Sequence, residues 1–109
     1  MVSATKKLIE FRDERDWAQF HDPKNLAAAL SIEAAELNEV FLWKTTEESS
    51  NVEVERVAEE LADVLAYALM LADRFGLDPE QIVLDKIEKN RQKYPADKAK
   101  GTSKKYTEL

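Results

Sequence analysis

Two pairs of acidic residues near the middle of the chain have a spacing that suits metal-ion chemistry. Glu33 and Glu36 stand three residues apart, and Glu60 and Asp63 repeat that spacing further along. Because residues three apart lie on one face of a helix, each pair predicts two neighbouring carboxylates. Such a pair is also common on a solvated helix surface, so one pair alone does not indicate a metal site.

The position of Glu33 argues against a solvated surface. Its segment carries an apolar stripe at helical spacing, formed by Leu26, Leu30, Leu37 and Val40. At about 100° per residue, Glu33 falls inside the arc of this stripe and Glu36 lies at its edge. Glu60 and Asp63 border a similar stripe in the next helical segment. If the two segments pack as an antiparallel hairpin, the four acids converge.

Four partly desolvated carboxylates at close range repel one another. Either their pKa values rise or a cation joins them. All the donors in this set are hard oxygens, and sites of several carboxylates suit Mg²⁺, or Mn²⁺ in its place. The two pairs together therefore predict a shared magnesium site between two helices.

Further along the chain, a cation and an amide have the spacing to hold phosphate. Lys86 and Asn90 stand one helical turn apart, and Lys93 lies close to the line of Lys86. Asn90 falls on the apolar face between Val83 and Tyr94. Beside a magnesium site, such donors can bind phosphate oxygens. Without the acidic pairs, a snorkelling lysine and a hydrogen-bonded asparagine would be the simpler interpretation.

The aromatic residues give a weaker indication of a nucleobase site. Trp17 and Trp43 flank the segment that carries Glu33, and an indole can stack on any base. Such tryptophans are more often core or interface residues. His21 is the only histidine, which argues against a histidine-based hydrolase, and a loop histidine beside a helix cap is more often structural than catalytic.

The acids must be positioned by helices, because the pattern of apolar residues and caps is helical throughout. The predicted helices run from about Ser3, as N-cap, to 15, from 23 to near Trp43, from 52 to 75 and from 79 to 94. Asp22 and Asp78 each precede a proline and suit the N-cap, with Gln81 completing a capping box after Asp78. Gly76 suits the end of the third helix, and the polar stretch 44–51 is predicted to be a loop.

These segments predict an all-α protein, a helical bundle of about four helices. A chain of 109 residues favours one domain, which we place at 1–95, followed by an extended basic tail at 96–109. The third helix is apolar nearly all round, which predicts a subunit interface.

The composition excludes several classes of partner and site. The net charge of −6 argues against a nucleic-acid partner, since phosphate contacts need basic residues. There is no cysteine, so disulfides and thiolate metal sites are excluded. The most apolar stretch, 61–72, is too short to span a membrane, and the first residues lack an apolar signal core. We therefore expect a cytoplasmic protein without a membrane partner.

The acidic pairs resemble the motifs of the MazG-like family of all-α nucleotide pyrophosphohydrolases. That family has Glu-x-x-Glu on one helix and Glu-x-x-Asp on the next, which stand here as Glu33-Ala-Ala-Glu36 and Glu60-Leu-Ala-Asp63. The likeness extends to the dCTP pyrophosphatase branch and covers nearly the whole chain. It is carried by the stretches 14–21, 23–26, 41–43, 59–67, 90–95 and 105–109.

The resemblance implies a set of site residues. Mg²⁺ would be bound by Glu33, Glu36, Glu60 and Asp63, and the triphosphate by Lys86, Asn90 and Lys93. Trp17, Trp43 and Tyr67 would line the nucleoside pocket, and we also assign His21 to it. Members of the family are usually tetramers built from helical dimers, which agrees with the apolar third helix. A homotetramer, or at least a dimer, is therefore expected.

Two positions depart from the family pattern. Ala35 stands where many relatives have glycine, and we expect little effect because the residue stays small. Leu8 stands where animal relatives have a histidine that contacts the substrate. The second change questions a preference for cytosine.

The expected reaction is magnesium-dependent cleavage of a nucleoside triphosphate to monophosphate and pyrophosphate. The expected substrate is dCTP or a related pyrimidine nucleotide, and Glu33 and Glu36 are the expected catalytic residues, with Glu36 accepting a proton from water. Two alternatives stay open: a helical oligomerisation module without catalysis, and a related enzyme that acts on dUTP or phosphoribosyl-ATP.

Overall fold

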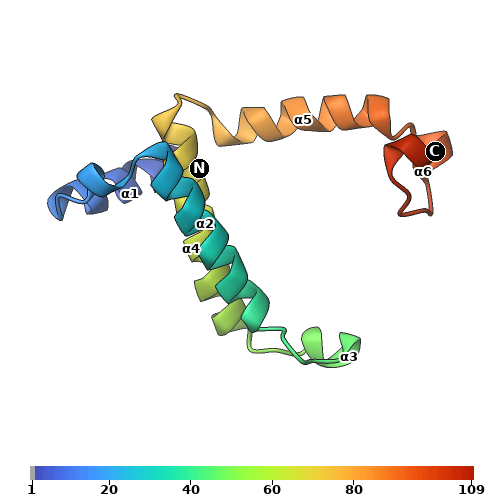
Figure 1. Cartoon of the computed structure of the whole chain (residues 1–109), viewed down its shortest axis with the longest axis horizontal. Helices are drawn as coiled ribbons and strands as arrows, with labels where there is room; N and C mark the ends of the chain where they lie inside the picture. The colour runs from blue at the N-terminus through green and yellow to red at the C-terminus, as the bar shows by residue number, and fades with distance from the viewer. Residues whose placement is uncertain (1) are drawn as a thin grey trace. The chain divides into compact units, whose positions relative to one another are not determined.

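The computed structural model of the protein describes residues 2–109, and all their regular structure is helical (Figure 1). The elements in chain order are α1 (Val2–Glu14), η1 (Ala18–Phe20), α2 (Pro23–Glu39), α3 (Thr46–Ser49), α4 (Val54–Arg74), α5 (Pro79–Lys93), α6 (Ala96–Ala99) and η2 (Tyr106–Glu108). The all-α prediction is confirmed, and the four longest helices are the four that were predicted.

The two long central helices begin and end for local reasons. Asp22 caps α2, because its carboxylate accepts the backbone N–H of Asn25 at 2.8 Å. Pro23 follows in the first turn, where its missing N–H costs no hydrogen bond. After α4, Gly76 has a φ of +65°, a left-handed conformation that stops the helix. All three roles agree with the sequence prediction.

Two predicted caps are wrong in detail. Asp78 accepts the backbone N–H of Gln81 at 3.2 Å, but the Gln81 amide donates to Asp85 at 2.8 Å. The capping box at α5 therefore lacks its return half. Ser3 is not an N-cap, because α1 already includes Val2.

The connection between α2 and α4 differs most from its prediction. α2 ends at Glu39 rather than near Trp43, whose φ of +64° is incompatible with helix. The predicted loop contains the short helix α3, which begins with a complete capping box. Thr45 Oγ1 accepts the N–H of Glu48 at 3.1 Å, and the Glu48 carboxylate accepts the N–H of Thr45 at 2.9 Å.

The helices α2 and α4 lie side by side as an antiparallel hairpin, and α1 also packs against α4 (Figure 1). Among the described residues, the buried apolar side chains all come from this hairpin. They are Leu26 and Val40 from α2 and its end, and Leu69, Met70 and Ala72 from α4. The hairpin is the arrangement that brings the two acidic pairs together.

The described residues form two compact units, one ending at Gly76 and the other spanning Leu77–Leu109. A single domain over 1–95 stays a prediction. We expected an extended tail after residue 95, but this segment contains α6 and η2 and is therefore not extended throughout. Across residues 2–109, no helix combines the length and the apolar character needed to cross a bilayer.

Candidate metal centre

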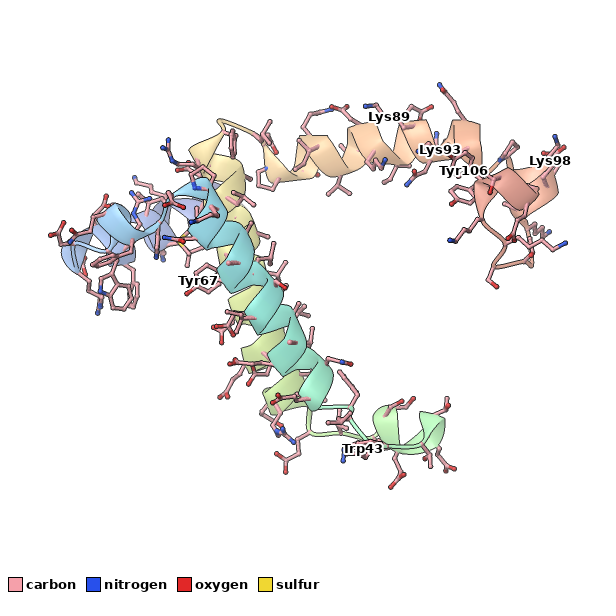
Figure 2. All side chains as sticks on the ribbon, in the orientation of Figure 1. Trp43, Tyr67, Lys89, Lys93, Lys98 and Tyr106 are labelled. Carbon is pink, nitrogen blue, oxygen red and sulfur yellow. The ribbon has the colours of Figure 1, made fainter. Side chains whose placement is uncertain are left out.

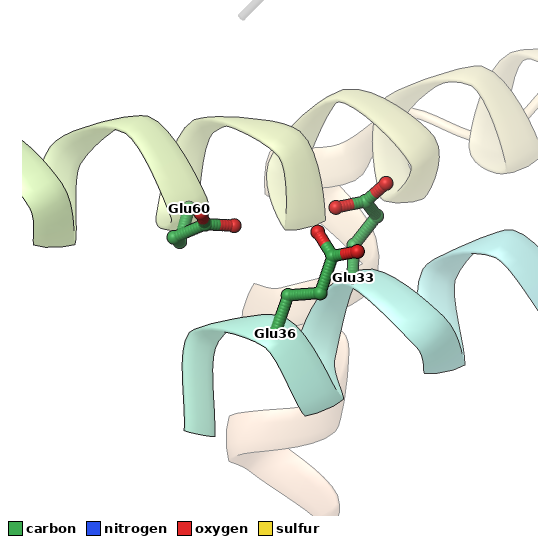
Figure 3. Close-up of side chains that lie close together, drawn as sticks. All are labelled: Glu33, Glu36 and Glu60. Carbon is green, nitrogen blue, oxygen red and sulfur yellow. The ribbon is translucent and has the colours of Figure 1, made fainter. Parts of the chain in front are cut away.

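Three acidic side chains meet in the seam of the hairpin. Glu33 and Glu36 extend from α2 toward Glu60 on α4 (Figure 3). One carboxylate oxygen from each residue lies within 4.8 Å of the other two. The spacing of three residues puts both α2 acids on one face, and the antiparallel packing supplies the third from the neighbouring helix.

Part of this cluster is shielded from water. Glu33 and Glu60 are half-buried, whereas Glu36 is exposed. One oxygen of Glu33 and one of Glu60, both Oε2, are buried without any hydrogen-bond partner. Leaving a buried acceptor unsatisfied is costly, and more so for a charged group. These two atoms therefore need a partner that residues 2–109 do not supply.

The electrostatics of Glu33 also indicate that the cluster lacks a positively charged partner. Its pKa is raised to about 6, first by a hydrogen bond with Glu36, then by burial and by the charges of Glu36, Asp63 and Glu60. A hydrogen bond between two carboxyl groups requires a shared proton. The raised pKa of Glu33 thus means that its ionised form is disfavoured among the neighbouring acids. A cation would relieve the same repulsion.

Asp63 lies at the margin of this cluster. It is exposed and does not belong to the three residues whose oxygens meet within 4.8 Å. Its charge nevertheless reaches Glu33 and contributes to the raised pKa of that group. The structure therefore brings together three of the four predicted ligands and leaves the fourth within electrostatic range.

The donor set fits a hard divalent cation. It contains carboxylate oxygens only, two of them buried and without partners. Mg²⁺ and Mn²⁺ prefer such oxygens, whereas nitrogen or sulfur donors would favour zinc or copper.

His21 and Tyr67 are the pair of expected nucleoside residues that the structure brings into contact. Their ring centroids lie 6.3 Å apart in an edge-to-face arrangement. Both residues are half-buried, and the Nδ1 atom of His21 is buried without a hydrogen-bond partner. Burial, with a smaller effect of the Arg12 charge, lowers the pKa of His21. This imidazole is therefore neutral at physiological pH.

Among the described residues, neither tryptophan makes a ring contact with His21 or Tyr67. Trp17 packs edge-on against Phe11, with centroids 5.8 Å apart, and is 44% exposed. Trp43 is 92% exposed in the connection between α2 and α4, whereas Tyr67 lies further along α4 (Figure 2). No ring contact in residues 2–109 joins Trp43 to another aromatic residue.

The expected phosphate-binding residues lie on α5 and are all exposed. Lys86 and Asn90 line an open groove of about 460 Å³ together with Ile82, Val83 and Ile87. Lys93 instead contacts an aromatic ring: its Nζ atom lies 5.0 Å from the centroid of Tyr106. The sequence gives no periodic signal for this contact, because it spans 13 residues.

The model of the MazG-like family matches residues 28–109, a stretch that contains both acidic pairs and α5. The chain belongs to the MazG-like family. The membership inferred from the Glu-x-x-Glu and Glu-x-x-Asp motifs is thereby confirmed.

Named relatives of this MazG-like chain are similar along most of its length. It is 49% identical to human dCTP pyrophosphatase 1 and 47% identical to the mouse protein, over 105 residues in each case. These alignments cover 92% of the chain but only 62% of each relative. A solved pyrophosphatase from Archaeoglobus fulgidus is 47% identical, with a TM-score of 0.79 over 83% of this chain and 87% of that one.

Proposed function

We propose that this MazG-like chain hydrolyses a nucleoside triphosphate to a monophosphate and pyrophosphate. The observation that carries the proposal is the cluster of Glu33, Glu36 and Glu60, with two buried and unpartnered carboxylate oxygens. Similarity to proteins named dCTP pyrophosphatase 1 supports dCTP, or a related pyrimidine nucleotide, as the substrate. A helical module without catalysis would give no reason to keep these acids together.

MazG-like pyrophosphatases use divalent metal ions, and we propose Mg²⁺, with Mn²⁺ as a substitute. Its ligands would be Glu33, Glu36 and Glu60, with Asp63 completing the set. When bound, the metal would neutralise the triphosphate and polarise the α-phosphorus.

Glu36 is our proposed proton acceptor. It is the exposed member of the cluster, so its carboxylate can meet water. Water oxygen would bond to the α-phosphorus as its proton passes to Glu36. The bond from phosphorus to the bridging oxygen would break, and pyrophosphate would leave with the electron pair.

The remaining side chains would hold the substrate. We propose that Lys86, Asn90 and Lys93 bind phosphate oxygens, since all three are exposed donors on one helix. His21 and Tyr67, in contact with each other, would bind the nucleoside. Trp17 and Trp43 stay proposed nucleoside residues on the resemblance alone, since neither contacts this pair.

Leu8 cannot hydrogen-bond a base at the position where the animal relatives have a histidine. It lines an apolar groove between α1 and α4, where it offers neither donor nor acceptor. We therefore propose that base selection rests on the nucleoside residues named above rather than on this position.

The same apolar groove supports our proposal of an oligomer. It has a volume of about 540 Å³ and is lined by Ala4, Lys7, Leu8, Phe11, Ala62, Leu65, Ala66 and Leu69. Phe11 is 49% exposed and Leu65 43% exposed. We propose that a second copy of the chain covers this face in a dimer, and that two dimers form a homotetramer in the cytoplasm.

Product analysis across a panel of nucleotides tests the proposed reaction. With Mg²⁺, wild-type protein should convert dCTP to dCMP and pyrophosphate, and the panel should rank dCTP against dUTP and phosphoribosyl-ATP. Glu33→Gln should abolish turnover, while Glu59→Gln, an exposed glutamate outside the cluster, should retain it. Release of orthophosphate instead of pyrophosphate, or undiminished activity in Glu33→Gln, would count against the proposal.

A further inference from the structure

The flexible side chain of Lys93 must be ordered when it binds phosphate. It is exposed at the last position of α5, and none of the ion pairs in residues 2–109 involves it. A lysine ammonium on a flexible stem samples many rotamers, and ordering it on a ligand costs entropy. This inference rests on the proposed function, in which Lys93 binds the triphosphate.

The aromatic ring of Tyr106 supplies a partner for this ammonium. Lys93 Nζ lies 5.0 Å from the ring centroid, and the two side chains lie together in Figure 2. A cation within about 6 Å of a centroid is attracted to the negative face of the ring. The ammonium has three donors, so a ring on one side leaves other donors for phosphate oxygens.

The Tyr106 ring itself contacts a second aromatic ring. Tyr94, the residue after Lys93, meets it edge-to-face with centroids 6.0 Å apart. The chain returns to the end of α5 through a turn in which Gly101 has a φ of +78° and Thr102 Oγ1 accepts the N–H of Lys104 at 3.2 Å. The residues that follow α5 thus return an aromatic ring to the lysine at its end.

We propose that Tyr106 is a positioning residue for Lys93. Its ring holds the ammonium in a limited set of positions, so that less side-chain entropy is lost when Lys93 meets the triphosphate. The Tyr106 hydroxyl has no part in this role. Phenylalanine at this position should therefore serve equally well, and leucine should not.

Steady-state kinetics with dCTP and Mg²⁺ test the role. Tyr106→Leu should raise KM about two- to fivefold, the range expected for an exposed cation–π contact, and should leave kcat unchanged. Tyr106→Phe should keep the wild-type KM. In a Lys93→Met background, Tyr106→Leu should have no further effect, because the partner is already gone. Lys89→Met removes a charge one turn earlier on α5 and serves as the control.

A second measurement does not depend on turnover. Lysines carrying ¹³C-methyl groups should give a Lys93 NMR signal shifted by the Tyr106 ring, and inorganic pyrophosphate should move that signal. In Tyr106→Leu the ring shift should vanish, and about two- to fivefold more pyrophosphate should be needed. If wild-type protein cleaves no triphosphate but gives these signals, the proposed function fails and the positioning role stands. If Tyr106→Leu matches wild type in KM and pyrophosphate binding, the positioning role is wrong.

Discussion

Glu33 lies where a negative charge is hard to hold. A hydrogen bond with Glu36, burial and the surrounding acids raise its pKa from 4.5 to about 6. In the metal-free protein, the stability that Glu33 contributes is therefore fully present below pH 4.5. It is lost as the pH rises through about 6, because the folded protein must then ionise a carboxyl group that the cluster disfavours.

Thermal unfolding in EDTA should reveal the cost of ionising Glu33 in the folded protein. Glu33→Gln cannot ionise, so its melting temperature should exceed that of wild type by an amount that grows between pH 4.5 and 6 and then levels off. Glu59→Gln, exposed and outside the cluster, should show no such growing difference. A constant gap between Glu33→Gln and wild type from pH 4 to 7.5 would contradict the electrostatic account.

Trp43 combines exposure with backbone strain. Its indole is 92% exposed and its φ is +64°, a region that costs a residue other than glycine about 1–2 kcal/mol. Residues with such backbone strain often cluster at functional sites. Trp43→Gly should therefore keep the free energy of unfolding within about 1 kcal/mol of wild type or raise it. It should also raise KM for dCTP if the indole binds the nucleoside. A large loss of stability in urea unfolding would show instead that the indole is a packing residue.

At the residue scale, spacing predicted the acids better than the aromatics. The three-residue interval placed Glu33 and Glu36 on one face of α2, because helical periodicity fixes neighbours along a face, and the expected antiparallel hairpin added Glu60. The contact between Lys93 and Tyr106 depends on how an irregular segment folds back. A helical period in the sequence does not predict how such an irregular segment folds back.

Among the helices, local caps set where the site-bearing segments begin. Asp22 accepts the N–H of Asn25 at the start of α2, the helix that carries Glu33 and Glu36. Asp22→Ala should lower the free energy of unfolding by about 1 kcal/mol, measured by urea denaturation. Asp22→Asn should stay close to wild type, since asparagine caps as well as aspartate. Equal losses in both variants would mean that the charge of Asp22, rather than its cap, stabilises the helix.

Helix existence was predictable, but the connection after α2 was not. The apolar spacing continues to Val40, which suggested a longer helix, yet Val40 is buried just past the end of α2. The signal for α3 was present as Thr45-x-x-Glu48, a capping box that a polar composition concealed. Local chemistry there outweighed the composition of the segment.

For the whole molecule, the exposed groove between α1 and α4 predicts assembly. Leu65 lines that groove and is 43% exposed, whereas Ile32 is 60% exposed on α2 and does not line it. Leu65→Lys should place an unpaired charge in the proposed interface and lower the mass measured by light scattering, with helical content kept. Ile32→Lys should leave the mass unchanged. The same mass in all three proteins would place the interface elsewhere.

The central claim is that the acidic seam holds a divalent cation. Thermal unfolding of wild type and Glu60→Gln over a series of Mg²⁺ concentrations tests it most directly, because a ligand that binds only the folded protein raises its melting temperature by mass action. We predict a steady rise with Mg²⁺ in wild type and little or none in Glu60→Gln. Identical curves for the two proteins, or a wild-type melting temperature that ignores millimolar Mg²⁺, would contradict the account.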